Sequence, residues 1–221
     1  MIAVRINKIK LLTSFFIAAT FTSSIAVNSN QSAIAEFLWT DALYYENCNQ
    51  YAQLEKWDLA IENCNKAIKL DPKSAESYLV RGMIYDRQEK SALALADYNR
   101  AIELNPKLTS AYVNRTNIYI EQNKLQLARI DSETAIQLEP NLAQAHATAG
   151  KLNLKLKNIE AARSNFQEAK QLLSARGETE KAEKMDEILD NLKYLKRYQN
   201  ILSRLGYSGI FDWIIDFAMR E

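Results

Sequence analysis

The sequence is poor in residues that interrupt helices. It has 3 prolines and 5 glycines among 221 residues, and these are the two residue types that cost most inside a helix. Few points along the chain therefore force a helix to stop. The abundance of Ala, Leu, Lys, Glu and Gln, which are good helix formers, points the same way. We expect an all-α protein.

The residues and motifs of common active sites are also missing. No group of His, Cys, Asp and Glu has metal-ligand spacing, and there is no phosphate-binding glycine loop or nucleophile elbow. No pair of carboxylates stands in an arrangement that suggests acid–base catalysis. The sequence therefore predicts a protein that is not an enzyme and that needs no cofactor or metal.

Neither positive nor negative charge predominates over the whole chain. The formal net charge is +1, which gives no electrostatic case for a nucleic-acid partner. The balance is uneven, because residues 1–35 contain three bases and no acid. Subtracting these three charges from +1 leaves −2 for residues 36–221.

The first 35 residues have the pattern of a secretory signal. Three bases, Arg5, Lys8 and Lys10, precede the apolar stretch 11–27, and a polar run then leads to small residues before position 36. We expect cleavage after Ala35, with a second possible cut after Ala26. The alternative is a retained membrane anchor, although 17 residues are fewer than the roughly 20 of a spanning helix. An exported location follows (periplasm, lumen or secreted), or a membrane-anchored one.

A repeat of 34 residues runs through the middle of the chain. Pro72, Pro106 and Pro140 show the period, which divides residues 41–176 into units 41–74, 75–108, 109–142 and 143–176. The fourth place holds Tyr44, Tyr78, Tyr112 and His146. The eighth holds Cys48, Gly82, Thr116 and Gly150. The twentieth and twenty-seventh always hold Ala. Two amphipathic stretches in each unit predict a helix–turn–helix solenoid.

These places resemble the tetratricopeptide-repeat (TPR) family. The family pattern has a large aromatic, a small residue, a second aromatic, two alanines and a closing proline, and unit 75–108 matches all of them. Departures are Cys48 and Thr116 in place of Gly, Ser132 in place of an aromatic, and Ser174 in place of Pro. The last of these predicts that the fourth unit runs straight on into the C-terminal segment.

Two pairs of places link the helices within a unit. The seventh and twenty-third hold Arg81 with Asp97 and Arg115 with Asp131, and we expect an Arg–carboxylate contact in each pair. Cys48 and Cys64 are the two cysteines. They face inward from opposite helices of the first unit, so they are expected to be neighbours, either bonded as a disulfide or present as two buried thiols.

The single histidine, His146, stands where the other units have Tyr. A packed position is therefore expected, not catalysis or metal binding.

The family resemblance implies that the surface of the first helices binds a protein or peptide, at a concave groove. The candidate groove residues are Tyr45, Asn49, Glu76, Leu79, Met83, Asn114, Asn117, Thr148 and Lys151. TPR domains that bind chaperone tails carry a clamp of Lys, Arg and two Asn. Here Tyr45, Val80 and Ser110 occupy three of the clamp places, which argues against that ligand.

Residues 177–221 are expected to form a helical cap and tail. An apolar stripe over 178–205, which includes Leu192, Tyr198 and Ile201, predicts one long helix that caps the solenoid. Residues 210–221 are very apolar and predict a short terminal helix. Three fates are open to it: docking on the chain's own helices, which we favour, contact with a partner or a second copy, and contact with a membrane.

Taken together, the sequence predicts a TPR solenoid over 36–176 that serves as a non-catalytic scaffold for a protein or peptide partner. The alternative is a membrane-tethered assembly subunit that keeps its N-terminal apolar segment.

Overall fold

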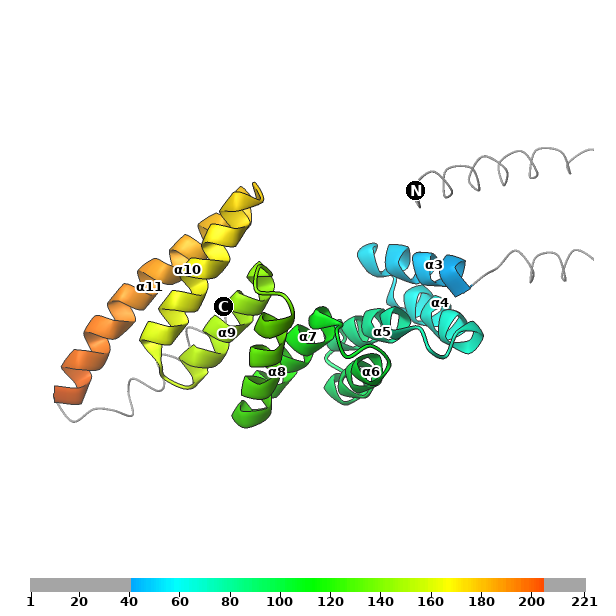
Figure 1. Cartoon of the computed structure of the whole chain (residues 1–221), viewed down its shortest axis with the longest axis horizontal. Helices are drawn as coiled ribbons and strands as arrows, with labels where there is room; N and C mark the ends of the chain where they lie inside the picture. The colour runs from blue at the N-terminus through cyan, green and yellow to red at the C-terminus, as the bar shows by residue number, and fades with distance from the viewer. Residues whose placement is uncertain (1–40, 205–221) are drawn as a thin grey trace, which may run out of the picture. The chain divides into compact units, whose positions relative to one another are not determined.

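The computed structural model of the chain describes residues 41–204, all of whose regular elements are helices. The predictions for residues 1–35 and 210–221 lie outside the described residues. Figure 1 shows the helices following one another in antiparallel pairs. They are α3 (Asp41–Gln53), α4 (Trp57–Leu70), α5 (Ala75–Arg87), α6 (Ser91–Leu104), α7 (Thr109–Glu121), α8 (Leu125–Leu138), α9 (Ala143–Lys155), α10 (Ile159–Ala175) and α11 (Thr179–Arg204). The all-α solenoid is confirmed.

The turn inside each unit has the same backbone conformation. Glu55, Glu89, Asn123 and Lys157 all have positive φ angles, between 55° and 61°. In unit 2 the next amide, that of Lys90, donates to the Tyr85 carbonyl at 2.8 Å. A left-handed residue followed by such a bond closes the end of a helix by satisfying one of its last carbonyls. Each of the four units therefore has the helix–turn–helix form that the repeat predicts.

The prolines explain where the second helices end. A residue before proline is pushed out of the helical region by the proline ring. Asp71, Asn105 and Glu139 precede the three prolines, with φ between −125° and −136° and ψ between 82° and 91°. Helices α4, α6 and α8 end directly before these residues.

The fourth unit departs from this pattern, and here the prediction of an uninterrupted run into the C-terminal segment is wrong. With Ser174 at the proline place, α10 continues three residues past the point where α4, α6 and α8 end. It then stops at Gly177, whose φ is +71°. The amide of Glu178 donates to the Leu173 carbonyl at 3.0 Å, which closes the helix end. Glycine reaches this conformation without strain, so a turn separates α10 from α11.

Packing proceeds from neighbour to neighbour. The two helices of each unit pack together, and each first helix also contacts the first helix of the next unit, from α3 to α9. The alanines at the twentieth and twenty-seventh places are at most 1% exposed, because the helices cross closely there. The first helices therefore form one continuous layer, whose surface is that of the predicted groove.

Helix α11 covers the end of the array. Its residues Leu189, Leu192 and Leu195 pack with Phe166 of α10 in one buried cluster. The predicted stripe is only partly buried, however, since Tyr198 is 52% and Ile201 43% exposed. The physical reason is length. Lys196 already bonds to Glu160, the second residue of α10, so α11 runs on past the helix that covers it. Within residues 41–204, no helix is long and apolar enough to cross a membrane.

Candidate functional site

The eighth and twenty-fourth places of each unit face each other across the helix pair. A Cβ placed on Gly82 would lie 2.7 Å from the Tyr98 ring, and one on Gly150 would lie 2.8 Å from the Phe166 ring. Unit 3 fills the same space with Thr116 and Ser132, both buried. A small residue thus accompanies a large one, or two middle-sized residues share the space.

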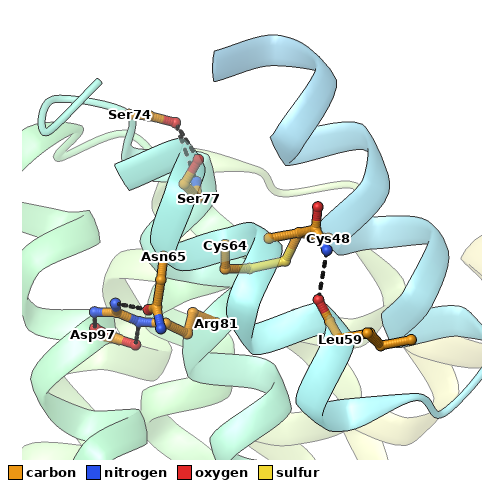
Figure 2. The surroundings of a disulfide bond; sticks show 9 residues. Cys48, Leu59, Cys64, Asn65, Ser74, Ser77, Arg81 and Asp97 are labelled. Carbon is orange, nitrogen blue, oxygen red and sulfur yellow. Dashed lines mark hydrogen bonds and ion pairs between the residues drawn. A yellow bond between two sulfur atoms is a disulfide. The ribbon is translucent and has the colours of Figure 1, made fainter. Parts of the chain in front are cut away.

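Unit 1 fills this space with Cys48 and Cys64, which the structure joins as a disulfide between α3 and α4 (Figure 2). Their Cα atoms are 5.2 Å apart, within the range that a disulfide spans. Both side chains are fully buried. The expected proximity of the two cysteines is confirmed.

The predicted Arg–carboxylate contacts are present in units 2 and 3. Arg81 donates to both Asp97 oxygens, at 2.8 and 2.7 Å, and Arg115 does the same with Asp131, at 2.7 and 2.8 Å. The hydrogen bonds to Asp97, which outweigh desolvation by burial, raise the pKa of Arg81. These are buried, bidentate pairs, and they fix the two helices of a unit against each other.

Each arginine also reaches the unit before its own, which the sequence did not reveal. Arg81 donates to Asn65 Oδ1 at 2.7 Å (Figure 2), and Arg115 donates to Asn99 Oδ1 at 2.6 Å. The twenty-fifth place is the signal that could have been noticed, since it holds Asn in units 1 and 2 alone. We call this chain of contacts from Asn65 to Asp131 the arginine ladder; it contains Asn65, Arg81, Asp97, Asn99, Arg115 and Asp131.

The repeated tyrosines flank these arginines. The guanidinium carbon of Arg81 lies 5.5 Å from the centre of the Tyr78 ring and 5.9 Å from that of Tyr85. Stacking of this kind is a favourable cation–π contact. The aromatic residues at the fourth and eleventh places of unit 2 therefore help to hold the ladder, and unit 3 repeats both contacts.

His146 reproduces the contact of the tyrosine that it replaces. In unit 3 the Tyr112 hydroxyl donates to the Pro106 carbonyl at 3.2 Å, and in unit 4 the His146 Nε2 lies 2.8 Å from the Pro140 carbonyl. A ring that carries its proton on Nε2 donates to that oxygen. The histidine thus ties its helix to the preceding turn, as expected for a packed position.

A groove of about 720 Å³ lies along the first helices of units 2, 3 and 4. Helices α5, α7 and α9 supply most of its wall, and α6 with the turn before it supplies the rest. The lining residues are Met83, Asp86, Arg87, Glu89, Ser91, Tyr98, Asn114, Asn117, Glu121, Gln144 and Lys151. Amides, acids and bases dominate this set, with one methionine and one aromatic ring. Such a lining suits an extended polar segment of protein better than a small apolar ligand.

Comparison with known proteins agrees with the repeat. Residues 75–108 match the family model described as Tetratricopeptide repeat, and residues 49–89 match the model described as TPR repeat. Among solved structures, the first TPR of Spaghetti (RPAP3) bound to the HSP90 peptide SRMEEVD is 30% identical, with a TM-score of 0.51. The similarity covers 61% of this chain and 99% of that one. The chain belongs to the tetratricopeptide-repeat family.

Two further TPR-like structures share the fold. MamA is 22% identical over 62% of this chain and 81% of its own, with a TM-score of 0.55. The Arabidopsis OM64 TPR domain is 23% identical over 52% of this chain and 94% of its own, with a TM-score of 0.50. A search of curated proteins found no match.

The groove of about 720 Å³ described above, which we call the TPR groove, contains four of the predicted groove residues: Met83, Asn114, Asn117 and Lys151. Thr148 does not belong to it, because its side chain is only 3% exposed. Its equivalent in unit 2, Val80, packs in one cluster with the cysteines of unit 1, so this place is used for packing between units.

The remaining predicted residues lie elsewhere on the TPR array. Tyr45 and Leu79 are partly buried against core clusters. Asn49 and Glu76 are accessible on α3 and α5 but are not part of the described groove lining. Sequence reasoning missed Asp86 and Glu121, which lie one helical turn beyond Met83 and Asn117 on the same faces, because the candidate rows ended before the last turn of each first helix. It missed Tyr98 because this residue lies on a second helix, α6.

Proposed function

We propose that the chain is a non-catalytic scaffold that binds a segment of a partner protein in the TPR groove of units 2 to 4. The observation that carries the proposal is the groove itself, which spans three units and is lined by hydrogen-bonding side chains. Amides such as Asn114 and Asn117 suit the backbone of an extended peptide, which has unpaired N–H and C=O groups. The TPR relative that is 30% identical was solved with a peptide.

The chaperone-tail ligand of that relative is not what we propose here. The peptide SRMEEVD carries three acidic residues. At the places of the carboxylate clamp, this chain has Tyr45, Val80 and Ser110 in place of the ligating side chains. We infer that the partner has a different chemistry.

We further propose that the protein works in an exported compartment. The leader-like pattern of residues 1–35 supports export. The Cys48–Cys64 disulfide supports it independently, because disulfides persist in oxidising compartments and are rare in the cytosol. The alternative, a membrane-tethered assembly subunit, requires that the apolar segment 11–27 is retained. The N-terminal residue of the native protein separates the two, since Glu36 or Val27 supports the exported scaffold.

Site-specific photocrosslinking in the native compartment tests the groove as the binding surface. A crosslinking amino acid at Asn117, in the groove, should capture a partner. The same amino acid at Gln137, exposed on the second helix of the same unit, is the matched control. A partner captured equally from both positions, or from Gln137 alone, would show that the groove is not the binding surface.

A further inference from the structure

Two carboxylates line the groove at the ends of neighbouring first helices. Asp86 is the penultimate residue of α5, and Glu121 is the last residue of α7. Both line the groove. Burial, and then the nearby charge of Glu121, raises the pKa of Asp86, an effect that Arg87 only partly opposes. The free protein therefore holds two like charges close together without compensating them fully.

Within the described residues, no base forms an ion pair with either carboxylate. Among residues 41–204, neither Asp86 nor Glu121 forms a hydrogen bond or an ion pair through its side chain. The two bases that line the groove, Arg87 and Lys151, form no ion pair with them either. Elsewhere along the solenoid acids do find partners, as Asp97 does with Arg81.

A buried hydroxyl at the same place also lacks a partner. Tyr98 is fully buried and lines the groove, yet its hydroxyl has no hydrogen bond within the described part of the chain. Burial first, and then the carboxylates of Asp86 and Asp97, raises the pKa of this phenol. Tyr98 and Asp86 line the same groove. Almost all buried polar groups in proteins are hydrogen-bonded, so an unpartnered one beside a groove needs a partner that enters from the groove, either water or a ligand.

The C-terminal ends of two helices add to the negative electrostatic potential at this place. Helices α5 and α7 both finish here, at Arg87 and Glu121. The C-terminal end of a helix carries a partial negative charge, because its last carbonyls have no partner within the helix. Two carboxylates, two helix C-termini and one phenol oxygen thus converge, and each of them interacts favourably with a cation that donates hydrogen bonds.

We propose that Asp86, Glu121 and the Tyr98 hydroxyl form a receptor for one lysine or arginine side chain of the bound protein segment. The two carboxylates accept hydrogen bonds from the ammonium or guanidinium, and the phenol oxygen accepts a third. The neighbouring amides Asn114 and Asn117 hold the backbone of that segment. This inference rests on the proposed function, since it names the chemistry of the partner in the same groove.

A metal ion is a poorer occupant of this place. Among the described residues, no group of three or more His, Cys, Asp and Glu could hold one. An acidic side chain is disfavoured at this place, because Asp86 and Glu121 would repel it. A single organic cation satisfies all three groups at once.

Selection from a phage-displayed library of random short peptides tests the receptor. The full chain, as purified, should enrich peptides that contain Lys or Arg. The variant D86N/E121Q should lose that preference, with affinity for a selected basic peptide falling about tenfold or more. The matched control is E168Q/E187Q, which removes the same charge from exposed positions of α10 and α11 and should behave like the unaltered chain. The charge-reversed variant D86K/E121K should enrich acidic peptides, which also shows that the groove is still folded.

The outcomes distinguish a failure of the proposed receptor from a failure of peptide binding in the groove. If the unaltered chain selects peptides without a basic preference, or if D86N/E121Q keeps that preference, the receptor is wrong and peptide binding stands. If no peptide is selected by the unaltered chain, peptide binding itself is contradicted, and the receptor with it.

Discussion

At the scale of single residues, the side chains at the eighth and twenty-fourth places of a unit share the space between its two helices. Gly82 is small because the Tyr98 ring occupies the position of a side chain there. Thr116 with Ser132, and the two cysteines of unit 1, are other solutions to the same volume. The residues at these two places are therefore coupled, and a change at one should be felt through the other.

Gly82→Thr should destabilise the protein strongly, because the added atoms meet the Tyr98 ring. We expect the free energy of unfolding to fall by about 2–3 kcal/mol. Adding Tyr98→Ser copies the pair of unit 3 and should cost less than the sum of the two single changes. Urea denaturation of all four proteins measures the coupling. Strict additivity would mean that the two places do not share their volume.

Asp86→Asn should stabilise the free protein while it weakens binding. The pKa of Asp86 is raised in the folded state, so its ionised form is penalised there. The penalty appears as pH rises through the ordinary Asp value of 3.8 and is complete above the raised pKa. We therefore expect a small gain in stability at pH 7 that vanishes in acid. Thermal melts at pH 7 and at pH 3 measure it, and a loss of stability at pH 7 would contradict it.

At the scale of helices, the sequence predicted the pairs and their turns because period and proline act locally. Each proline displaces the residue before it from the helical region, and the 34-residue period repeats the turn. The overrun of α10 was predicted from the missing proline, but its end before Gly177 was not, since the loss of proline says only that a helix can continue. Groove residues were predicted in part, because helical spacing identifies a face but not how deeply neighbouring units cover it, as Thr148 shows.

The disulfide should hold α3 to α4 and stabilise the first unit. It joins residues 16 positions apart, and closing a loop of that length contributes roughly 3 kcal/mol in the chain-entropy model. Cys48→Ala with Cys64→Ser should lower stability by about that amount. Hydrogen exchange should rise over 41–70 first. Alkylation of the unfolded but unreduced native protein is the direct check, since two modified thiols would exclude the bond.

Arg81→Leu should cost about 3 kcal/mol, because it leaves the buried Asp97 carboxylate unpaired. Adding Asp97→Leu should recover most of that loss, since the stranded charge is then gone. Chemical denaturation of the single and double variants measures both steps. The exposed pair of Arg100 with Glu103 is the control, and Arg100→Leu should cost far less. A double variant as unstable as Arg81→Leu alone would contradict this account.

At the scale of the whole molecule, the C-terminal segment decides how the array ends. Residues 210–221 lie outside the described residues, and their docking on the chain's own helices stays a prediction from their apolar sequence. Truncation after Leu205 should then lower the melting temperature by about 5 °C or more. An unchanged melting temperature and a monomeric truncated chain would argue against docking, and the segment should then be tested as a bait for a partner.

The arginine ladder has one further consequence for the array. It crosses from unit 1 to unit 2 and from unit 2 to unit 3, but unit 3 has Glu133 and unit 4 has Ala149 at the places that would continue it. Stability in a solenoid is close to a sum of unit and interface contributions. The seam between units 3 and 4 lacks the arginine–asparagine link that the other two seams possess, and its polar contacts run to the Pro140 and Asn141 carbonyls instead. Under tension or partial denaturation, units 3 and 4 should therefore separate first. Units 1 to 3 should stay together through the arginine ladder, and unit 4 should stay packed against α11.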